Sequence, residues 1–233
     1  RGLQATLQSE ESVIPVDDMF IVCDVYNIDY YRDSALELNT IIGAVENTQQ
    51  LSIEGLNLAR SNFLPEVVAM GGASIYSYNL SDMLPRWAVG VGVTMPLFSG
   101  LSNRAQYRAS KSLVCSVDDM VAKVKEDILL LVDKEYYTLQ NTLLSVASSE
   151  RSIAFAESYY NTVLEGFREG VTASSELMDA RIALAASRVE YLDAVYNYML
   201  SLARLLEVSG LSDDFAEYLG RGEEVDITDV IDL

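Results

Sequence analysis

The sequence predicts a mainly α-helical protein in which a long antiparallel helical hairpin is joined to a two-stranded β-hairpin. Three observations lead to this fold class. Residues 101–165 follow a helical pattern and contain neither Gly nor Pro. A second helical run extends from about residue 172 to residue 208. Between 87 and 98, large apolar and small residues alternate as they do along a β-strand.

The N-terminal part is expected to be irregular before the first long helix. Residues 1–8 could close a helix, whereas residues 9–35 contain Pro15 and many Asp, with a short strand possible over Met19–Val25. Apolar residues at mixed three- and four-residue spacings then predict a helix over 36–62, which the Leu64-Pro65 pair ends. The chain opens on RGLQATLQSEES without an initiator Met, so we expect a piece of a longer or processed protein.

Two strands, Glu66–Tyr78 and Trp87–Phe98, are predicted to form a β-hairpin around the polar loop 79–86. One face of the second strand carries only large apolar side chains: Trp87, Val89, Val91, Val93, Met95 and Leu97. The alternation has two interpretations. The strand either covers a soluble core or presents a lipid face opposite a small, water-facing side.

Aromatic residues favour the membrane interpretation. Antiparallel pairing places Tyr76, Tyr78 and Trp87 near one end of the hairpin and Phe63 and Phe98 near the other. At a tilt of about 40°, Trp87 and Phe98 would lie roughly 28 Å apart in height, close to the apolar band of a membrane barrel. Two strands cannot close a barrel, so further strands would have to come from other sequence or other subunits.

The helical hairpin is predicted over 99–210, with its tip at 166–175. An apolar stripe at helical spacing runs along the first helix and includes Leu113, Val117, Met120 and Ile128. Gly166 and Gly170 are expected to end this helix, and Thr172 or Ser174 to cap the next one. A helix of about 65 residues spans roughly 100 Å. The acidic tail 211–233 is expected to be loosely ordered.

Composition excludes several functions. The 233 residues carry a net charge of −19, which would repel nucleic acid. The chain has no histidine, so His-based catalysis and ordinary zinc sites are excluded, and we expect no enzyme activity, metal or cofactor. Cys23 and Cys115 are expected to be two free, packed thiols rather than a disulfide. The sequence contains no stretch of about 18 apolar residues, so we expect no transmembrane helix.

Four segments in order resemble the TolC-type outer membrane efflux protein family. They are A-R-S-x-F-L-P from residue 59, the M-P-L-F-S-G joint from residue 95, R-A-Q-x-x-A-S-K from residue 104, and the L-M-D-A…N-Y…L-A-R-L-L run from residue 177. The resemblance covers residues 36–210 and is to the second of the family's two repeats. It makes Pro65, Pro96 and Gly100 the joints between the membrane strands and the periplasmic helices.

The resemblance implies a homotrimeric channel in the bacterial outer membrane that extends into the periplasm. Segment 1–35 would be the end of the first repeat with the equatorial segment, 36–62 and 99–210 periplasmic helices, 63–98 the outer-membrane hairpin in contact with lipid, and 211–233 an equatorial tail. A periplasmic adaptor (membrane fusion protein) and an inner-membrane transporter would be its partners.

The resemblance also implies functional residues at the tip. Phe167, Glu176 and Asp179 match the family's gate-forming aromatic and acids. Thr172 stands where a basic residue is expected, and Arg168 is near enough to substitute. Gly166, Gly170 and Val171 fall where the family meets its adaptor. Without the resemblance, the acids at the helix start are ordinary partners of the helix dipole.

Two functions remain in competition. The first is a passive export conduit, in a tripartite efflux pump or a type I secretion system. The second is a soluble, extended coiled-coil interaction protein with a small β-hairpin. The face formed by Val89, Val91 and Val93 discriminates between them, because detergent-dependent solubility and a trimer would support the channel.

Overall fold

The computed structural model describes residues 19–22, 24–73, 87–95 and 100–225. These residues form two compact units, one of Ile41–Lys125 and one of the described residues up to Thr40 and from Glu126 onward. The helix α4 (Ser102–Arg168) contributes its first part to the former and its remainder to the latter. Helices dominate both units, which confirms the predicted fold class.

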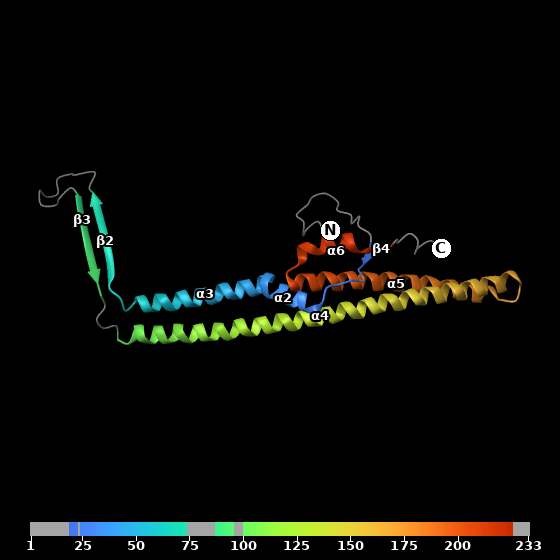
Figure 1. Ribbon diagram of the computed structural model, residues 1–233, viewed down its shortest axis with the longest axis horizontal. Helices are drawn as coiled ribbons and strands as arrows, with labels where there is room; N and C mark the ends of the chain where they lie inside the picture. Colours follow the sequence, from blue (N-terminus) through green and yellow to red (C-terminus); the bar gives the residue numbers. More distant parts are fainter. Residues whose placement is uncertain (1–18, 23, 74–86, 96–99, 226–233) are drawn as a thin grey trace. The chain divides into compact units, whose positions relative to one another are not determined.

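In the Ile41–Lys125 unit, α3 (Thr40–Ser61) lies beside the first part of α4 (Figure 1). The inward positions of α3 alternate three- and four-residue steps, as helices packed knobs-into-holes do: 42, 45, 49, 52, 56 and 59. The α4 positions 103, 107, 110, 114, 117, 121 and 124 do the same. Leu113 and Met120, predicted in the stripe, lie outside this seam and are exposed.

The β-hairpin of this unit pairs β2 (Glu66–Ala73) with β3 (Trp87–Thr94), antiparallel. Its register pairs Val67 with Val93, Ala69 with Val91 and Ala73 with Trp87, so the two strands share one large apolar face. On the other face, Val68 lies opposite Gly92 and Met70 opposite Gly90, so the small residues of this face belong mainly to β3. Residues 74–86 and 96–99 lie outside the described residues, so the predicted strand ends, loop and Tyr76, Tyr78, Pro96 and Phe98 are not placed.

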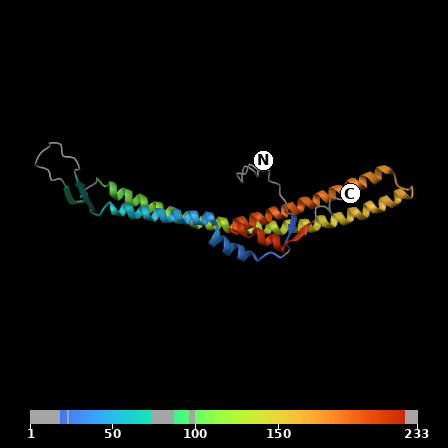
Figure 2. The ribbon, with the colours of Figure 1, turned by 90° about the horizontal axis from the view of Figure 1, so that it is seen from above.

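In the second unit, α5 (Ser174–Ser209) runs back along the remainder of α4 in both views (Figures 1 and 2). The α4 seam comprises 128, 132, 135, 139, 142, 146, 149, 153, 156, 160 and 163. The α5 seam comprises 177, 180, 184, 187, 191, 194, 198, 201 and 205. Both seams repeat every seven residues, which gives a left-handed supercoil. A single extra four-residue step interrupts the α4 pattern between 124 and 132, where its partner changes from α3 to α5.

The predicted irregular N-terminal segment is wrong for Ile28–Ala35. These residues belong to α2 (Ile28–Leu38), which ends before α3. The single helix predicted over 36–62 is therefore two helices. Asn39 separates them because its backbone is extended and its side-chain amide donates to the Val208 carbonyl oxygen at 2.7 Å. Of the suggested Met19–Val25 strand, Met19–Ile21 form β1, and the described residues Val22, Asp24 and Val25 are not part of a strand.

The predicted loosely ordered tail is wrong up to Val225. It contains a 3₁₀ turn η1 (Ser212–Asp214), α6 (Phe215–Arg221) and β4 (Glu223–Val225), and β4 pairs antiparallel with β1. These elements and α2 pack on α5 around a core of fully or almost fully buried side chains, which includes Phe20, Tyr31, Tyr198, Leu202, Leu205, Leu206 and Tyr218. Acidic composition concealed this order, because only a few apolar residues in each element are buried.

Two glycines end the helices of the hairpin. Gly170 and Gly210 adopt positive φ, and the amide after each one donates to a carbonyl five residues back, as in a Schellman motif. Gly166, predicted to help end α4, lies inside its last turn instead. The predicted caps of α5 are also wrong. Ala173 occupies the N-cap and offers no side-chain oxygen.

Candidate functional site

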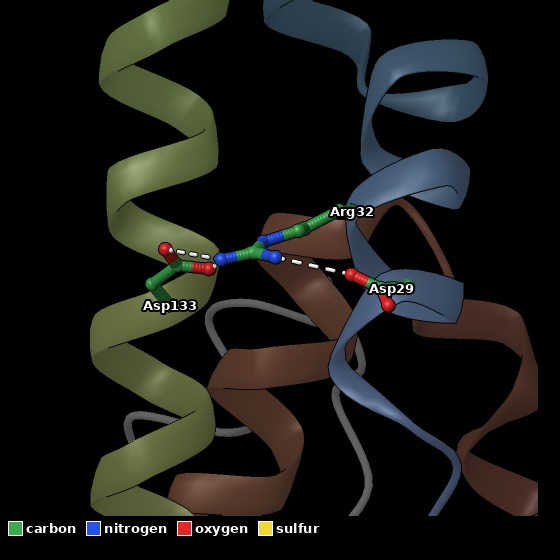
Figure 3. Close-up of polar contacts among 3 residues, drawn as sticks. All are labelled: Asp29, Arg32 and Asp133. Carbon is green, nitrogen blue, oxygen red and sulfur yellow. Dashed lines mark hydrogen bonds and ion pairs between the residues drawn. The ribbon is translucent and has the colours of Figure 1, made fainter.

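An ion-pair cluster links α2 to α4. Figure 3 shows the Arg32 guanidinium extending from α2 between Asp133 of α4 and Asp29 of its own helix. Arg32 Nε and Nη2 each lie 2.7 Å from one Asp133 carboxylate oxygen, a bidentate geometry. This bonding lowers the pKa of Asp133 below its ordinary value and raises that of Arg32. Sequence reasoning missed the pair, although Arg32 is the only basic residue between 19 and 38.

A buried polar contact attaches the segment after β1 to α5. The Tyr198 hydroxyl donates to the Val22 carbonyl oxygen at 2.6 Å and accepts from the Val22 amide at 3.2 Å. Tyr31 and Tyr218 join their hydroxyls at 2.8 Å nearby, and burial raises the pKa of both. These tyrosines satisfy polar groups inside the core and hold the C-terminal elements on the helices.

The tip carries the predicted gate and adaptor residues. Phe167 and Arg168 end α4, while Glu176 and Asp179 lie in the first turns of α5. Arg168, Glu176 and Asp179 make no ion pair with any residue that the structure describes. The roles predicted for these residues therefore remain predictions.

Thr172 has a structural role at the tip. Its amide donates to the Gly166 carbonyl oxygen at 3.2 Å, and its side chain occupies the space that a Cβ on residue 166 would need. A side chain at position 166 would therefore require the Thr172 side chain to move. Gly170 adopts the left-handed backbone conformation at the turn, and Val171 is 79% exposed.

The predicted strand–helix joints are partly described. Gly100 and Leu101 both have positive φ immediately before α4, which fits a sharp change of chain direction. On the other strand, Pro65 separates α3 from β2. Phe63 packs edge-on against Tyr107 of α4, with ring centroids 6.4 Å apart, and Trp87 is exposed.

Each helix of the α4–α5 hairpin carries a second apolar stripe on the side opposite its seam. On α4 the stripe is Leu130, Tyr137 and Leu144; on α5 it is Ile182, Val189 and Tyr196. Members of each stripe are seven residues apart and are between 58% and 70% exposed. Nothing in the described chain covers them. The sequence contained this signal, but only one apolar stripe, on the first helix, was predicted from it.

The hairpin also has a groove of about 510 Å³ between α4 and α5. Small residues form much of its lining, with Phe155, Tyr159, Arg151 and Glu190 among the larger ones.

Among the described residues, no group of three acidic or cysteine side chains could hold a metal ion, and none of the helices combines the length and the apolar composition of a membrane span. Cys115 is a free, exposed thiol rather than a packed one, and Cys23 lies outside the described residues.

Comparison with known proteins agrees with this architecture. The family model described as "Outer membrane efflux protein" matches residues 32–211. The alkaline protease secretion protein AprF of Pseudomonas aeruginosa is 25% identical over 189 residues, 79% of this chain and 39% of that protein. The outer membrane efflux protein BepC of Brucella suis is 24% identical over 123 residues, 53% of this chain and 27% of that protein.

A solved structure is similar in fold over almost the whole chain. The CmeC outer membrane channel of Campylobacter jejuni superposes with a TM-score of 0.69 at 17% identity, covering 97% of this chain and 48% of that one. This likeness shows the fold, and the chain spans less than half the length of each of these proteins. Because the family match covers most of the chain, the protein belongs to the outer membrane efflux protein family.

Proposed function

We propose that this chain is the second half of a subunit of a homotrimeric outer-membrane channel, which exports compounds across the periplasm and the outer membrane. The chain would act as a passive conduit in a tripartite efflux pump or a type I secretion system. Its relatives support both settings, since one is named as a protease secretion protein and another as an efflux protein. Energy would come from an inner-membrane transporter, reached through a periplasmic adaptor.

The observation that carries this proposal is the second apolar stripe on each hairpin helix. A helix in an isolated two-helix hairpin needs one seam, and its opposite side should be polar. In a closed ring each helix has a neighbour on both sides and needs two seams. Ile182, Val189 and Tyr196 on α5 have the seven-residue spacing that packing against another helix requires. We infer that helices of the remaining sequence and of other subunits cover these stripes.

The β-hairpin supports the same conclusion. Every residue of β2 and all but one of β3 are exposed, so this unit offers the hairpin no core to cover. On β3, the face with Trp87 and the three valines lies opposite a face of Ala88, Gly90, Gly92 and Thr94, and such a strand suits a position between lipid and water. In a membrane the outer edges of β2 and β3 must pair with further strands, which an oligomer would supply.

At the tip, we propose that Phe167, Arg168, Glu176 and Asp179 restrict the channel and that Gly166, Gly170 and Val171 contact the adaptor. The three charged side chains make no ion pair within the described chain and are free to reach a neighbouring subunit. Thr172 is not basic and its side chain packs on Gly166, so we take Arg168 as the basic residue of the gate. In full-length protein, changing both Arg168 and Asp179 to Ala should increase conductance in bilayers; unchanged conductance would refute the gate assignment.

The molecular mass of full-length protein in detergent tests the proposed assembly. We expect a trimer, with Val189→Glu shifting it towards smaller species, because a carboxylate would enter an apolar helix–helix seam. Asn197→Glu, at an exposed position about 100° around the helix from Tyr196 and so off the stripe, should leave the trimer intact. Circular dichroism would verify that both variants remain helical. A detergent-independent monomer would support the soluble coiled-coil alternative, and a fully trimeric Val189→Glu would refute the role of the stripe.

A further inference from the structure

The outer side of α2 carries tyrosines and carboxylates in one row. Tyr26, just before the helix, and Tyr30, Asp33 and Glu37 follow each other at steps of four, three and four residues. All four are exposed, while the opposite side of α2 buries Tyr31 and Ala35. We refer to these four residues as the tyrosine–carboxylate face. Asp33 and Glu37 lie outside the core, and part of each tyrosine ring is exposed, so this face can contact another molecule.

The surroundings of this face are strongly acidic. Segments 19–38 and 212–225 together contain nine Asp and Glu but only Arg32 and Arg221. Both arginines already have partners within the chain. Arg32 points away towards Asp133 (Figure 3), and Arg221 bonds the Tyr26 hydroxyl and the Asp24 carbonyl oxygen, both at 3.1 Å. Asp33 and Glu37 therefore remain without a cation among the described residues.

The chain itself shows which cation fits the tyrosines. The Arg221 guanidinium lies 5.0 Å from the centre of the Tyr26 ring and 5.4 Å from that of Tyr218. Tyr30 continues this aromatic surface, with its centroid 4.6 Å from that of Tyr26, and no described guanidinium stacks on it. Guanidinium groups stack on aromatic rings and also pair with carboxylates, whereas a lysine ammonium is more strongly hydrated.

We propose that the tyrosine–carboxylate face binds an arginine-rich segment of another protein. One arginine stacks on Tyr30 beside the Tyr26–Arg221 pair, and neighbouring arginines pair with Asp33 and Glu37. The charge of this surface selects a basic polypeptide and repels nucleic acids and anionic lipid. This inference does not depend on the proposed transport function, because it uses only contacts within the second unit.

Fluorescence anisotropy of labelled hexa-arginine and hexa-lysine peptides, titrated with the purified protein in detergent, tests the proposal. Hexa-arginine should bind more tightly, and its affinity should fall with added salt. Tyr30→Leu should weaken hexa-arginine binding about two- to fivefold and leave hexa-lysine unchanged, whereas Tyr30→Phe should retain binding. Asp33→Asn should weaken the binding of both peptides.

Matched controls are available elsewhere on the chain. Tyr159→Leu changes a tyrosine as exposed as Tyr26, and Asp193→Asn neutralises an exposed acid on α5. Neither should alter binding of the peptides. Absence of binding, equal affinity for the two peptides, or an equal loss on Tyr159→Leu would overturn the proposal. Circular dichroism of Tyr30→Leu and Tyr30→Phe would separate a lost contact from a lost fold.

Discussion

Replacing Tyr198 by Phe should destabilise the packing of the β1 segment on α5 without creating a large cavity. The aromatic ring stays in place, fully buried, and only the hydroxyl that binds Val22 is removed. Val22 is itself 3% exposed, so its amide and carbonyl lose their partner away from water. An unpaired buried polar group costs roughly 1–3 kcal/mol, so we expect a total loss of about 2–4 kcal/mol.

The assay is urea denaturation followed by circular dichroism, with the free energy of unfolding taken from linear extrapolation. Tyr196→Phe is the matched control, since this tyrosine lies two residues earlier on the same helix and is exposed. Its change should stay within about 0.5 kcal/mol. Hydrogen exchange of the Val22 amide should accelerate only in Tyr198→Phe. Equal unfolding midpoints for the two variants would refute the reasoning that this buried hydroxyl fixes the segment.

Three further predictions concern the same unit. Gly210→Ala should lower the free energy of unfolding by more than about 1–2 kcal/mol in urea denaturation, because residue 210 has φ +74° and the added Cβ would lie 2.8 Å from the Leu38 carbonyl carbon. Gly220→Ala is the control, and because the space around residue 220 is open, it should be nearly neutral or stabilising. In the wild type, the lowered pKa of Asp133 contributes stability that is present above the ordinary carboxyl pKa of 3.8 and is lost as the pH falls through the lower folded pKa. Asp133→Asn should remove this contribution. Thermal melts measured over a pH series test this, and an identical loss of stability at acid pH in both proteins would contradict it. Leu202→Ala should cost about 2–5 kcal/mol in the same denaturation assay, and a smaller loss would mean that the fully buried site can collapse.

Periodicity and alternation in the sequence were enough to predict the main architecture. Residues 101–165 lack helix breakers and carry an apolar stripe at helical spacing, and together with the second helical run up to residue 208 they predict a hairpin. The alternation at 87–94 likewise predicts a strand, which the register of β3 confirms. Such signals are local, so one chain segment contains all the information that each element needs.

The compact C-terminal elements could not be predicted in this way, because their order depends on distant contacts. Tyr31 is buried through a partner 187 residues away, Tyr218. Asn39 interrupts the predicted helix through a bond to Val208, 169 residues away. In a stretch rich in Asp and Tyr, neither contact leaves a periodic trace. The acids suggested an irregular segment, whereas the Arg32–Asp133 ion pair and the Tyr31–Tyr136 ring contact connect α2 with α4.

The tip illustrates a different limit. A resemblance supplied roles for Phe167, Arg168 and Glu176, while the single chain supplies only their positions. Their chemistry would arise between subunits, where neither the sequence nor one chain contains the partner. Gly166 is different, because its contact with Thr172 is internal and gives a physical reason for glycine at that position.

The most direct test of the channel assignment compares the two faces of β3 in full-length protein. Gly90→Cys and Val91→Cys, each in a background with Cys23→Ser and Cys115→Ser, place a thiol on opposite faces; a Cβ at residue 90 meets only ordinary contact with Met70. In lipid vesicles, a charged, membrane-impermeant thiol reagent should modify Gly90→Cys, which would face the water-filled channel, and should leave Val91→Cys, which would face lipid, unmodified. Equal modification at both positions, as in a hairpin surrounded by water, would contradict the channel.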